Sequence, residues 1–83
     1  MIVVKVLGSG CENCKKVEAV ARAAVSHLGV EADVVKITDW NEIQRYPILG
    51  TPGLVINEKV VSAGRIPSQD EVAAWLKDAT LAV

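Results

Sequence analysis

The sequence predicts an α/β domain in which a four-stranded mixed sheet is flanked by three helices, in the order β-α-β-α-β-β-α. Three observations lead to this fold class. Two β-rich runs enclose a long segment of helical period, two closely spaced short runs have the form of a hairpin, and helical spacing returns near the end of the chain. With 83 residues, the chain suits one domain, which we expect to span residues 1–83.

Two strands are predicted in the first half of the chain. Ile2–Leu7 is a β-rich run whose only charge is Lys5, which is typical of a strand covered on both faces. Lys5 itself we interpret as an exposed lysine at a sheet edge or strand end. Val30–Ile37 alternates apolar and polar residues and predicts a second strand. An intervening helix makes this pair parallel, with a right-handed crossover.

The long helix between these strands starts near Glu12, after the break Gly8-Ser9-Gly10, and ends before Gly29, a residue suited to a helix C-terminus. Its apolar positions recur at helical spacing and form a single stripe: Val17, Val20, Ala21, Ala24, Val25 and Leu28. His27 lies off this stripe, so we expect it at the surface.

Two capping boxes predict the remaining helices. Asp39 followed by Glu42 predicts a short helix that Pro47 limits, because the residue before a proline avoids helical geometry. Ser68 followed by Glu71 predicts the last helix, whose apolar residues also stand at helical spacing.

A hairpin is predicted between these two helices. Leu54–Ile56 and Val60–Ala63 are short β-rich runs joined across Asn57-Glu58-Lys59. We expect Gly64 to allow a bend after the second strand and Arg65 to be a solvated charge.

Charge and hydropathy exclude several classes of protein. Nine basic and ten acidic residues give a net charge of −1, without a basic patch, so we expect no nucleic-acid partner. The apolar runs are far shorter than the ~20 residues that span a bilayer, so we expect no membrane association. The chain enters a strand pattern at once, without the charged and apolar regions of a signal peptide, and we therefore expect a cytoplasmic protein.

The cysteine pair Cys11 and Cys14 is the main chemical signal. A loop this small would stabilise the fold little as a disulfide, so the pair is more plausibly catalytic or metal-binding. Free N–H groups at a helix start stabilise an anion, which would lower the pKa of the Cys11 thiol from ~8.5 and make it a nucleophile. Cys14, further into the helix, would be more buried and could resolve a mixed disulfide.

Thr51-Pro52-Gly53 comes directly before the third predicted strand. A proline at the first position of a strand removes no needed hydrogen-bond donor. The tripeptide alone leaves open whether the Thr51–Pro52 bond is cis, which would expose the Thr51 backbone, or an ordinary trans turn.

Taken together, the Cys-x-x-Cys pair after the first strand and Thr51-Pro52 before the hairpin resemble the thioredoxin superfamily, in particular its small thioredoxin-like and glutaredoxin-like redox-active disulfide proteins. The resemblance covers nearly the whole chain. It implies a minimal thioredoxin-like fold, with Cys11 as nucleophile and Cys14 as resolving thiol. It also implies a cis proline at Pro52 facing the disulfide, and a Thr51 backbone that binds an extended substrate segment.

The sequence departs from the family pattern at several positions. The flanking aromatic residue and intervening proline of thioredoxins are missing around Glu12-Asn13, and so is the Cys-Pro-Tyr-Cys of glutaredoxins. Lys5 stands where thioredoxins keep a buried carboxylate that accepts a proton. These differences bear on redox potential, reductant and substrate, not on the exchange chemistry.

The predicted function is therefore thiol–disulfide oxidoreductase, of the protein-disulfide reductase type, in which Cys11 and Cys14 form a redox-active centre for electron transport. We expect protein or low-molecular-weight disulfides as substrates, a thiol reductase as partner, and neither a cofactor nor a metal. Two alternatives remain: a soft-metal module binding copper through the two thiolates, and a thioredoxin-like domain used only for docking. The metal-binding alternative is disfavoured because small copper chaperones have the order β-α-β-β-α-β.

Three aromatic residues outside these motifs are expected to be structural. Trp40 and Trp75 lie in or beside helical stripes, which favours the core or the wall of a groove. Tyr46 precedes Pro47, and we favour simple loop packing over a place at the active-site face.

Overall fold

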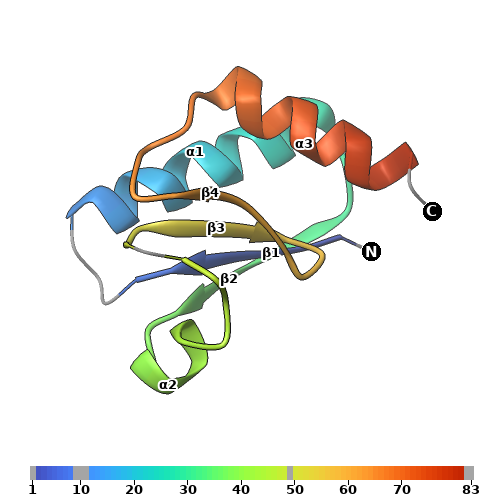
Figure 1. The fold of residues 1–83 in the computed structure, drawn as a ribbon. Helices are drawn as coiled ribbons and strands as arrows, with labels where there is room; N and C mark the ends of the chain where they lie inside the picture. Colours follow the sequence, from blue (N-terminus) through green and yellow to red (C-terminus); the bar gives the residue numbers. More distant parts are fainter. Residues whose placement is uncertain (1, 9–11, 49, 82–83) are drawn as a thin grey trace.

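The computed structural model of the chain describes residues 2–8, 12–48 and 50–81. Its described elements follow the predicted order, as Figure 1 shows from blue to red. The elements are β1 (Ile2–Leu7), α1 (Glu12–Leu28), β2 (Ala32–Ile37), α2 (Trp40–Ile43), β3 (Gly53–Ile56), β4 (Lys59–Ala63) and α3 (Gln69–Leu81).

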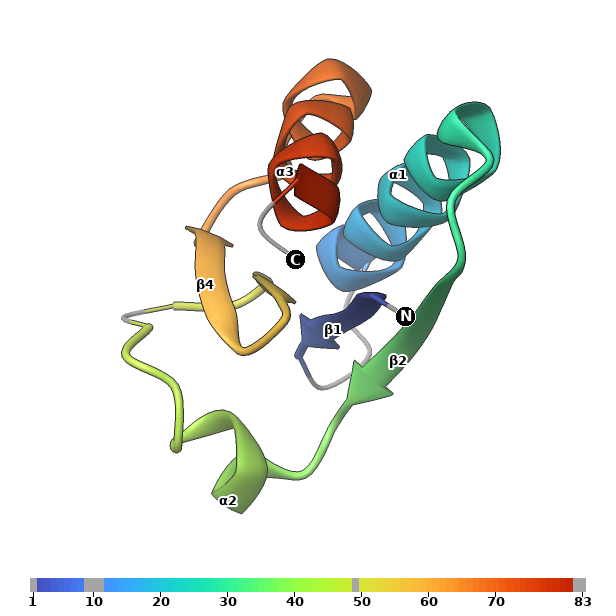
Figure 2. The same ribbon diagram turned by 90° about the vertical axis from the view of Figure 1, so that its right-hand side faces the viewer.

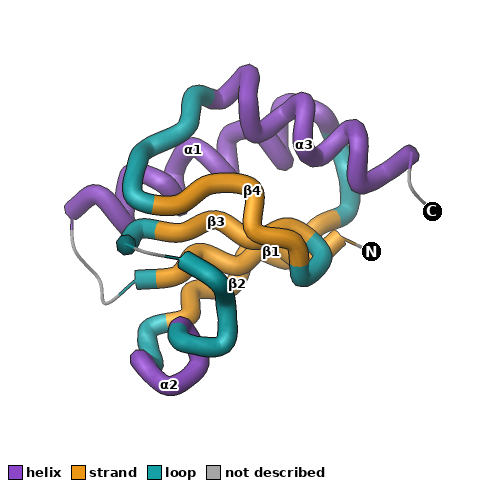
Figure 3. The backbone as a smooth tube through the Cα atoms, in the orientation of Figure 1, coloured by secondary structure: helices purple, strands orange, loops and turns teal. Residues whose placement is uncertain are grey.

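The described strands form one mixed sheet in the order β2-β1-β3-β4 (Figure 3). β1 pairs parallel with β2 and antiparallel with β3, and β3 pairs antiparallel with β4. Through this register, Leu7 lies beside Ile37 and Gly53, and Gly53 beside Ala63. The segments that follow β1, β2 and β4, and the segment that precedes β3, therefore meet at the same end of the sheet.

One face of the sheet is covered by α1 and α3, which lie side by side across it (Figure 2). Their apolar stripes pack on the inward side chains of β1 and β3, as the helical spacing predicts. The buried residues of this core are Ile2, Val4, Val6, Val17, Ala21, Ala24, Leu54, Ile56, Val72 and Leu76.

Among the described helices, the one-turn helix α2 alone lies on the opposite face (Figure 2). A smaller cluster forms there from Leu7, Ile43 and Val55, at the end of β1 that leads to α1. Val3 and Lys5, further back on the same face of β1, are only partly buried. The expectation of a first strand fully covered on both faces is therefore wrong for this part of β1, because α2 is too short to reach it.

Lys5 also corrects the expectation of a lysine at an edge or strand end, since it lies in the middle of an inner strand, between Val35 of β2 and Val55 of β3. Its ammonium group donates to the Tyr46 hydroxyl at 2.8 Å and to a Glu58 carboxylate oxygen at 2.5 Å. The hydrogen bond to Glu58 is the main cause that raises the pKa of Lys5 above its ordinary value and lowers the pKa of Glu58.

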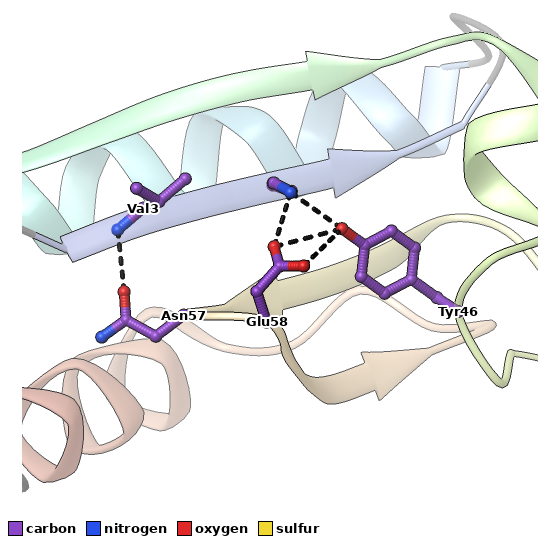
Figure 4. A network of polar contacts seen from close by, with 5 residues as sticks. Val3, Tyr46, Asn57 and Glu58 are labelled. Atoms are coloured by element: carbon purple, nitrogen blue, oxygen red, sulfur yellow. Dashed lines mark hydrogen bonds and ion pairs between the residues drawn. The ribbon is translucent and has the colours of Figure 1, made fainter.

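This network holds the β3–β4 turn against β1 (Figure 4). The Tyr46 hydroxyl donates to Glu58, and the backbone N–H of Val3 donates to the side chain of Asn57. Asn57 and Glu58 have φ values of 50° and 67°, the left-handed geometry of a tight hairpin turn. Tyr46 is thus engaged in loop packing, as predicted.

Local signals at helix ends predict most element boundaries. Gly29, with φ of 66°, ends α1, and the Asp39 side chain accepts from the N–H of Asn41 at the start of α2. Trp75 packs against the core, as expected, but Trp40 is 58% exposed and belongs neither to the core nor to a groove wall. In this one-turn helix Ile43 is the residue that packs on the sheet, whereas Trp40 lies on the side exposed to solvent.

Candidate functional site

Cys14 lies in the first turn of α1, at the end of the sheet where the loops meet. Its side chain is 5% exposed, consistent with the predicted more buried position of this cysteine. Cys11 precedes α1 in the sequence and lies outside the described residues, together with the neighbouring residues 9 and 10.

The segment Thr51-Pro52 reaches the same end of the sheet from the opposite direction, directly before β3. The Thr51–Pro52 peptide bond is cis, Thr51 is exposed and Pro52 is buried. The carbonyl of Pro52 accepts a hydrogen bond of 2.9 Å from the backbone N–H of Gly64, which has φ of 75° and forms the predicted bend after β4. The loop after β4 therefore fixes the position of Pro52 through this backbone hydrogen bond.

Gly8 is the point at which the two motifs adjoin. It is buried directly after β1, and its N–H donates to the carbonyl of Ile37 at 3.0 Å. A Cβ atom placed on Gly8 would overlap the Sγ atom of Cys14, would lie 3.2 Å from Cys14 Cβ and would lie 3.9 Å from Thr51 Cβ. The absent side chain of Gly8 thus leaves the space in which the Cys14 thiol lies, beside Thr51.

A cavity of about 100 Å³ opens next to Cys14, on the side toward β2. Its described lining is Val6, Gly8, Cys14, Lys15, Glu18, Lys36 and Thr38. A larger hollow, of about 460 Å³, lies at the other end of the sheet between the hairpin and α3, and shares no lining residue with the first. Of these two cavities, the smaller one is lined by Cys14.

Glu18 and Lys36 carry opposite charges in the wall of this small cavity. A Glu18 oxygen lies 3.6 Å from Lys36 Nζ across the gap between α1 and β2, and the other oxygen accepts from Arg22 Nε at 2.9 Å. The hydrogen bond from Arg22 is the main cause that lowers the pKa of Glu18, and Lys36 adds to it. Glu18 is therefore a carboxylate at neutral pH, with its side chain only 16% exposed.

Arg65 is not the freely solvated charge that its position in a loop suggests. Its guanidinium forms two parallel hydrogen bonds to the Glu71 carboxylate, of 3.0 and 2.7 Å. Glu71 also completes the predicted capping box, since it accepts from the N–H of Ser68 and its own N–H donates to the Ser68 hydroxyl. This clamp fixes the loop whose first residue, Gly64, bonds to Pro52.

Replacing Glu71 with glutamine is expected to reduce the loss in free energy of unfolding that occurs as the pH falls. The fork from Arg65 lowers the pKa of Glu71 from 4.5 to about 2, so the native state gains stability from this carboxylate above pH 4.5 and loses it as the pH falls toward 2. Urea unfolding at several pH values between these limits measures the slope. Arg65→Gln should flatten it in the same way, and a wild-type slope in both variants would contradict the role of the clamp.

The sequence predicted Cys14, Thr51 and Pro52 as site residues, and the structure places them at one end of the sheet. The sequence did not single out Gly8, Glu18 or Lys36 as site residues. A usable signal existed for Glu18, because residues four apart on a helix share a face and Glu18 is four residues after Cys14. No local pattern connects Lys36 with the cysteines.

Within the described part of the chain, no helix has the length and hydropathy needed to cross a membrane. Within residues 2–8, 12–48 and 50–81, no group of three or more histidine, cysteine, aspartate or glutamate residues is arranged to hold a metal ion.

Comparison with known proteins assigns the family. A family model described as "Thioredoxin domain" matches residues 2–77. A thioredoxin of Methanocaldococcus jannaschii is 38% identical over 77 residues, covering 93% of this chain and 88% of the relative. A thioredoxin of Methanothermobacter thermautotrophicus is 33% identical over 72 residues, covering 87% and 94%. These relatives define a class of thiol–disulfide oxidoreductases. The chain belongs to the thioredoxin domain family.

A solved structure supports the fold independently. The germline-specific thioredoxin Deadhead of Drosophila melanogaster aligns with a TM-score of 0.57 at 21% identity, over 96% of this chain and 80% of that one. The architecture of a four-stranded mixed sheet with three helices, seen in the described residues, is thus a thioredoxin-like fold.

Proposed function

We propose that the chain is a thiol–disulfide oxidoreductase that reduces protein or low-molecular-weight disulfides through Cys11 and Cys14. The Cys11 thiolate attacks a substrate disulfide, forms a mixed disulfide and releases one substrate thiolate. Cys14 then loses its proton and attacks the Cys11 sulfur, which releases the second substrate thiolate and leaves a Cys11–Cys14 disulfide. The substrate gains an electron pair and the protein loses one.

The observation that carries this proposal is the meeting of Cys14 and Thr51 at Gly8. A buried thiol in the first turn of a helix lies beside an exposed residue that precedes a cis proline, at the end of the sheet. Cys11 directly precedes α1 in the sequence, and a helix start provides unpaired N–H groups that favour a thiolate. In this proposal Thr51 and Pro52 bind the substrate segment next to the cysteine pair.

The partners follow from the same chemistry. Each turnover leaves the protein oxidised, so a thiol reductase must return electrons to the Cys11–Cys14 pair. The exchange itself needs no cofactor, because both sulfur atoms belong to the chain. We place the protein in the cytoplasm, as a single domain of residues 1–83. In that reducing compartment a Cys-x-x-Cys pair is typically redox-active rather than structural.

Cys14→Ser is expected to trap the mixed disulfide, because the serine hydroxyl cannot displace the substrate from Cys11. With insulin as the disulfide substrate and dithiothreitol as the reductant, the wild-type protein should accelerate insulin reduction. When the reduced variant is freed of dithiothreitol and then mixed with insulin, it should instead accumulate a covalent adduct that is visible on a non-reducing gel and is cleaved by reductant.

Cys11→Ser is the matched control, since it retains Cys14 and removes the attacking thiol. It should form no adduct and catalyse no reduction. The proposal fails if the wild-type protein leaves insulin disulfides intact, or if the adduct forms equally well in the Cys11→Ser variant.

A further inference from the structure

The thiol of Cys14 faces a chemical problem that arises from its burial. A thiol has a pKa of ~8.5 in water and attacks as the thiolate, so Cys14 must lose a proton before or as it resolves the mixed disulfide. Its side chain is only 5% exposed. Direct transfer of this proton to bulk water is therefore restricted, and a nearby acceptor would accelerate the step.

The small cavity beside Cys14 contains the groups that face this thiol. Its charged residues are Lys15 and Glu18 of α1 and Lys36 of β2. The lining residues from β1 and from the segments after β1 and β2 are uncharged. A volume of about 100 Å³ is large enough for water, and the polar lining provides hydrogen-bond partners for it. The cavity can thus connect the thiol with a side chain that is not in direct contact with it.

Glu18 is the one carboxylate among the described residues of this lining. It lies one helical turn after Cys14, on the same side of α1. Arg22 and Lys36 hold its two oxygens, and both contacts favour the charged form. The other charged side chains of the lining, Lys15 and Lys36, carry ammonium groups, which donate hydrogen bonds and have no lone pair to accept a proton. Each carboxylate oxygen still has a lone pair beyond its contact with Arg22 or Lys36, so Glu18 is the described residue of this lining that can accept a proton.

We propose that the Glu18 carboxylate accepts the proton that Cys14 loses when it attacks the mixed disulfide, through water in the cavity between α1 and β2. The sulfur of Cys14 forms a bond to the sulfur of Cys11, the bond from Cys11 to the substrate breaks, and the substrate leaves as a thiolate. Glu18 takes up the proton and returns it to solvent. Lys36 keeps the carboxylate at the cavity wall and stabilises the developing thiolate. This inference rests on the proposed function and adds a residue to it.

The test separates the two chemical steps with dithiobis(nitrobenzoate), a disulfide whose coloured thiolate is released once by each cysteine. Attack by Cys11 releases the first equivalent, and attack by Cys14 on the resulting mixed disulfide releases the second. For Glu18→Gln we expect an unchanged first phase and a second phase at least about tenfold slower at about pH 6. The difference should shrink as the pH passes ~8.5, where the thiol loses its proton to solvent.

Two measurements distinguish proton acceptance from other effects of the substitution. In a Cys11→Ser background, Cys14 is the remaining thiol of the chain, and its alkylation rate against pH gives its pKa. Removing the negative charge of Glu18 cannot raise that pKa, so slower attack without a raised thiol pKa identifies a lost acceptor. Glu31→Gln makes the same chemical change at an exposed residue before β2, at the opposite end of the sheet, and should keep the wild-type second phase.

The outcomes are distinguishable from failure of the proposed function. A wild-type protein that releases no second equivalent would overturn the proposed function and this inference with it. A normal second phase in the wild type that Glu18→Gln leaves unchanged, or slows equally at every pH, would overturn the role of Glu18 alone. Recovery of part of the rate at about pH 6 by Glu18→Asp, which keeps a carboxylate, would support it.

Discussion

Replacing Gly8 with alanine is expected to slow the step carried out by Cys14 about a hundredfold, since a misplacement of about 1 Å at a reacting group has effects of that size. The added Cβ atom would overlap the Cys14 Sγ atom and would come within 3.2 Å of Cys14 Cβ. Cys14 must therefore move from its place in the first turn of α1. The same crowding in a buried position should also destabilise the fold by about 1–3 kcal/mol.

The kinetic effect should be concentrated in one step. With dithiobis(nitrobenzoate), the second thiolate released should be delayed much more than the first. Gly50→Ala is the matched control, because it adds the same methyl group next to Thr51, where the nearest atom outside the adjacent residues, Gly64 Cα, is 3.9 Å away. A Gly8→Ala protein with wild-type kinetics in both phases would show that Gly8 does not set the position of the Cys14 thiol.

Leu54→Ala is expected to have the largest effect on stability, a loss of about 2–5 kcal/mol. Leu54 is fully buried in β3, between Val6 of β1 and Ser62 of β4, and belongs to the core beneath α1 and α3. Truncation removes buried apolar contacts and leaves a cavity that surrounding strands cannot fill. For a domain of this size, each kcal/mol lowers the melting temperature by about 4–8 °C.

Val35→Ala provides the comparison for this core substitution, since Val35 is also an aliphatic strand residue but is 40% exposed on β2. It should change stability by less than about 0.5 kcal/mol. Thermal unfolding of the two variants, followed by circular dichroism, measures the difference. Equal losses would contradict the assignment of the main core to the face covered by α1 and α3.

Much of the fold could be predicted because its elements have strong local signals. The apolar stripe of α1, its end at Gly29 and the capping box of Ser68 and Glu71 all depend on residues within a few positions of one another. The hairpin followed from two short runs around a turn. Tertiary packing agrees with these local preferences, so the order of elements was predicted correctly.

The coverage of the second sheet face could not be predicted from local patterns. How far α2 extends over β1 depends on its length, and the structure limits it to Trp40–Ile43. The environment of Lys5 depends on Tyr46 and Glu58, which are 41 and 53 positions away in the sequence. A lysine with such distant partners looks like a surface residue in the sequence, although it lies on an inner strand.

The candidate site shows the same division. Cys14 and Thr51-Pro52 were recognisable because their chemistry is unusual and their positions relative to the strands are informative. Gly8 was interpreted only as a break between elements. The thiol that occupies the space beside its Cα atom belongs to Cys14, six residues later in a helix. Lys36 meets Glu18 only because the parallel pairing of β1 and β2 brings the end of β2 beside α1.

An equilibrium redox titration of the Cys11–Cys14 pair tests the central claim most directly. The protein is equilibrated in buffers of graded dithiothreitol or glutathione, its free thiols are alkylated, and the oxidised fraction is read by mass. Our account predicts one reversible transition, in which both cysteines change together, with a midpoint between about −300 and −120 mV. The account would be contradicted if no intramolecular disulfide formed in this range while the reduced protein bound Cu(I) tightly and catalysed no exchange.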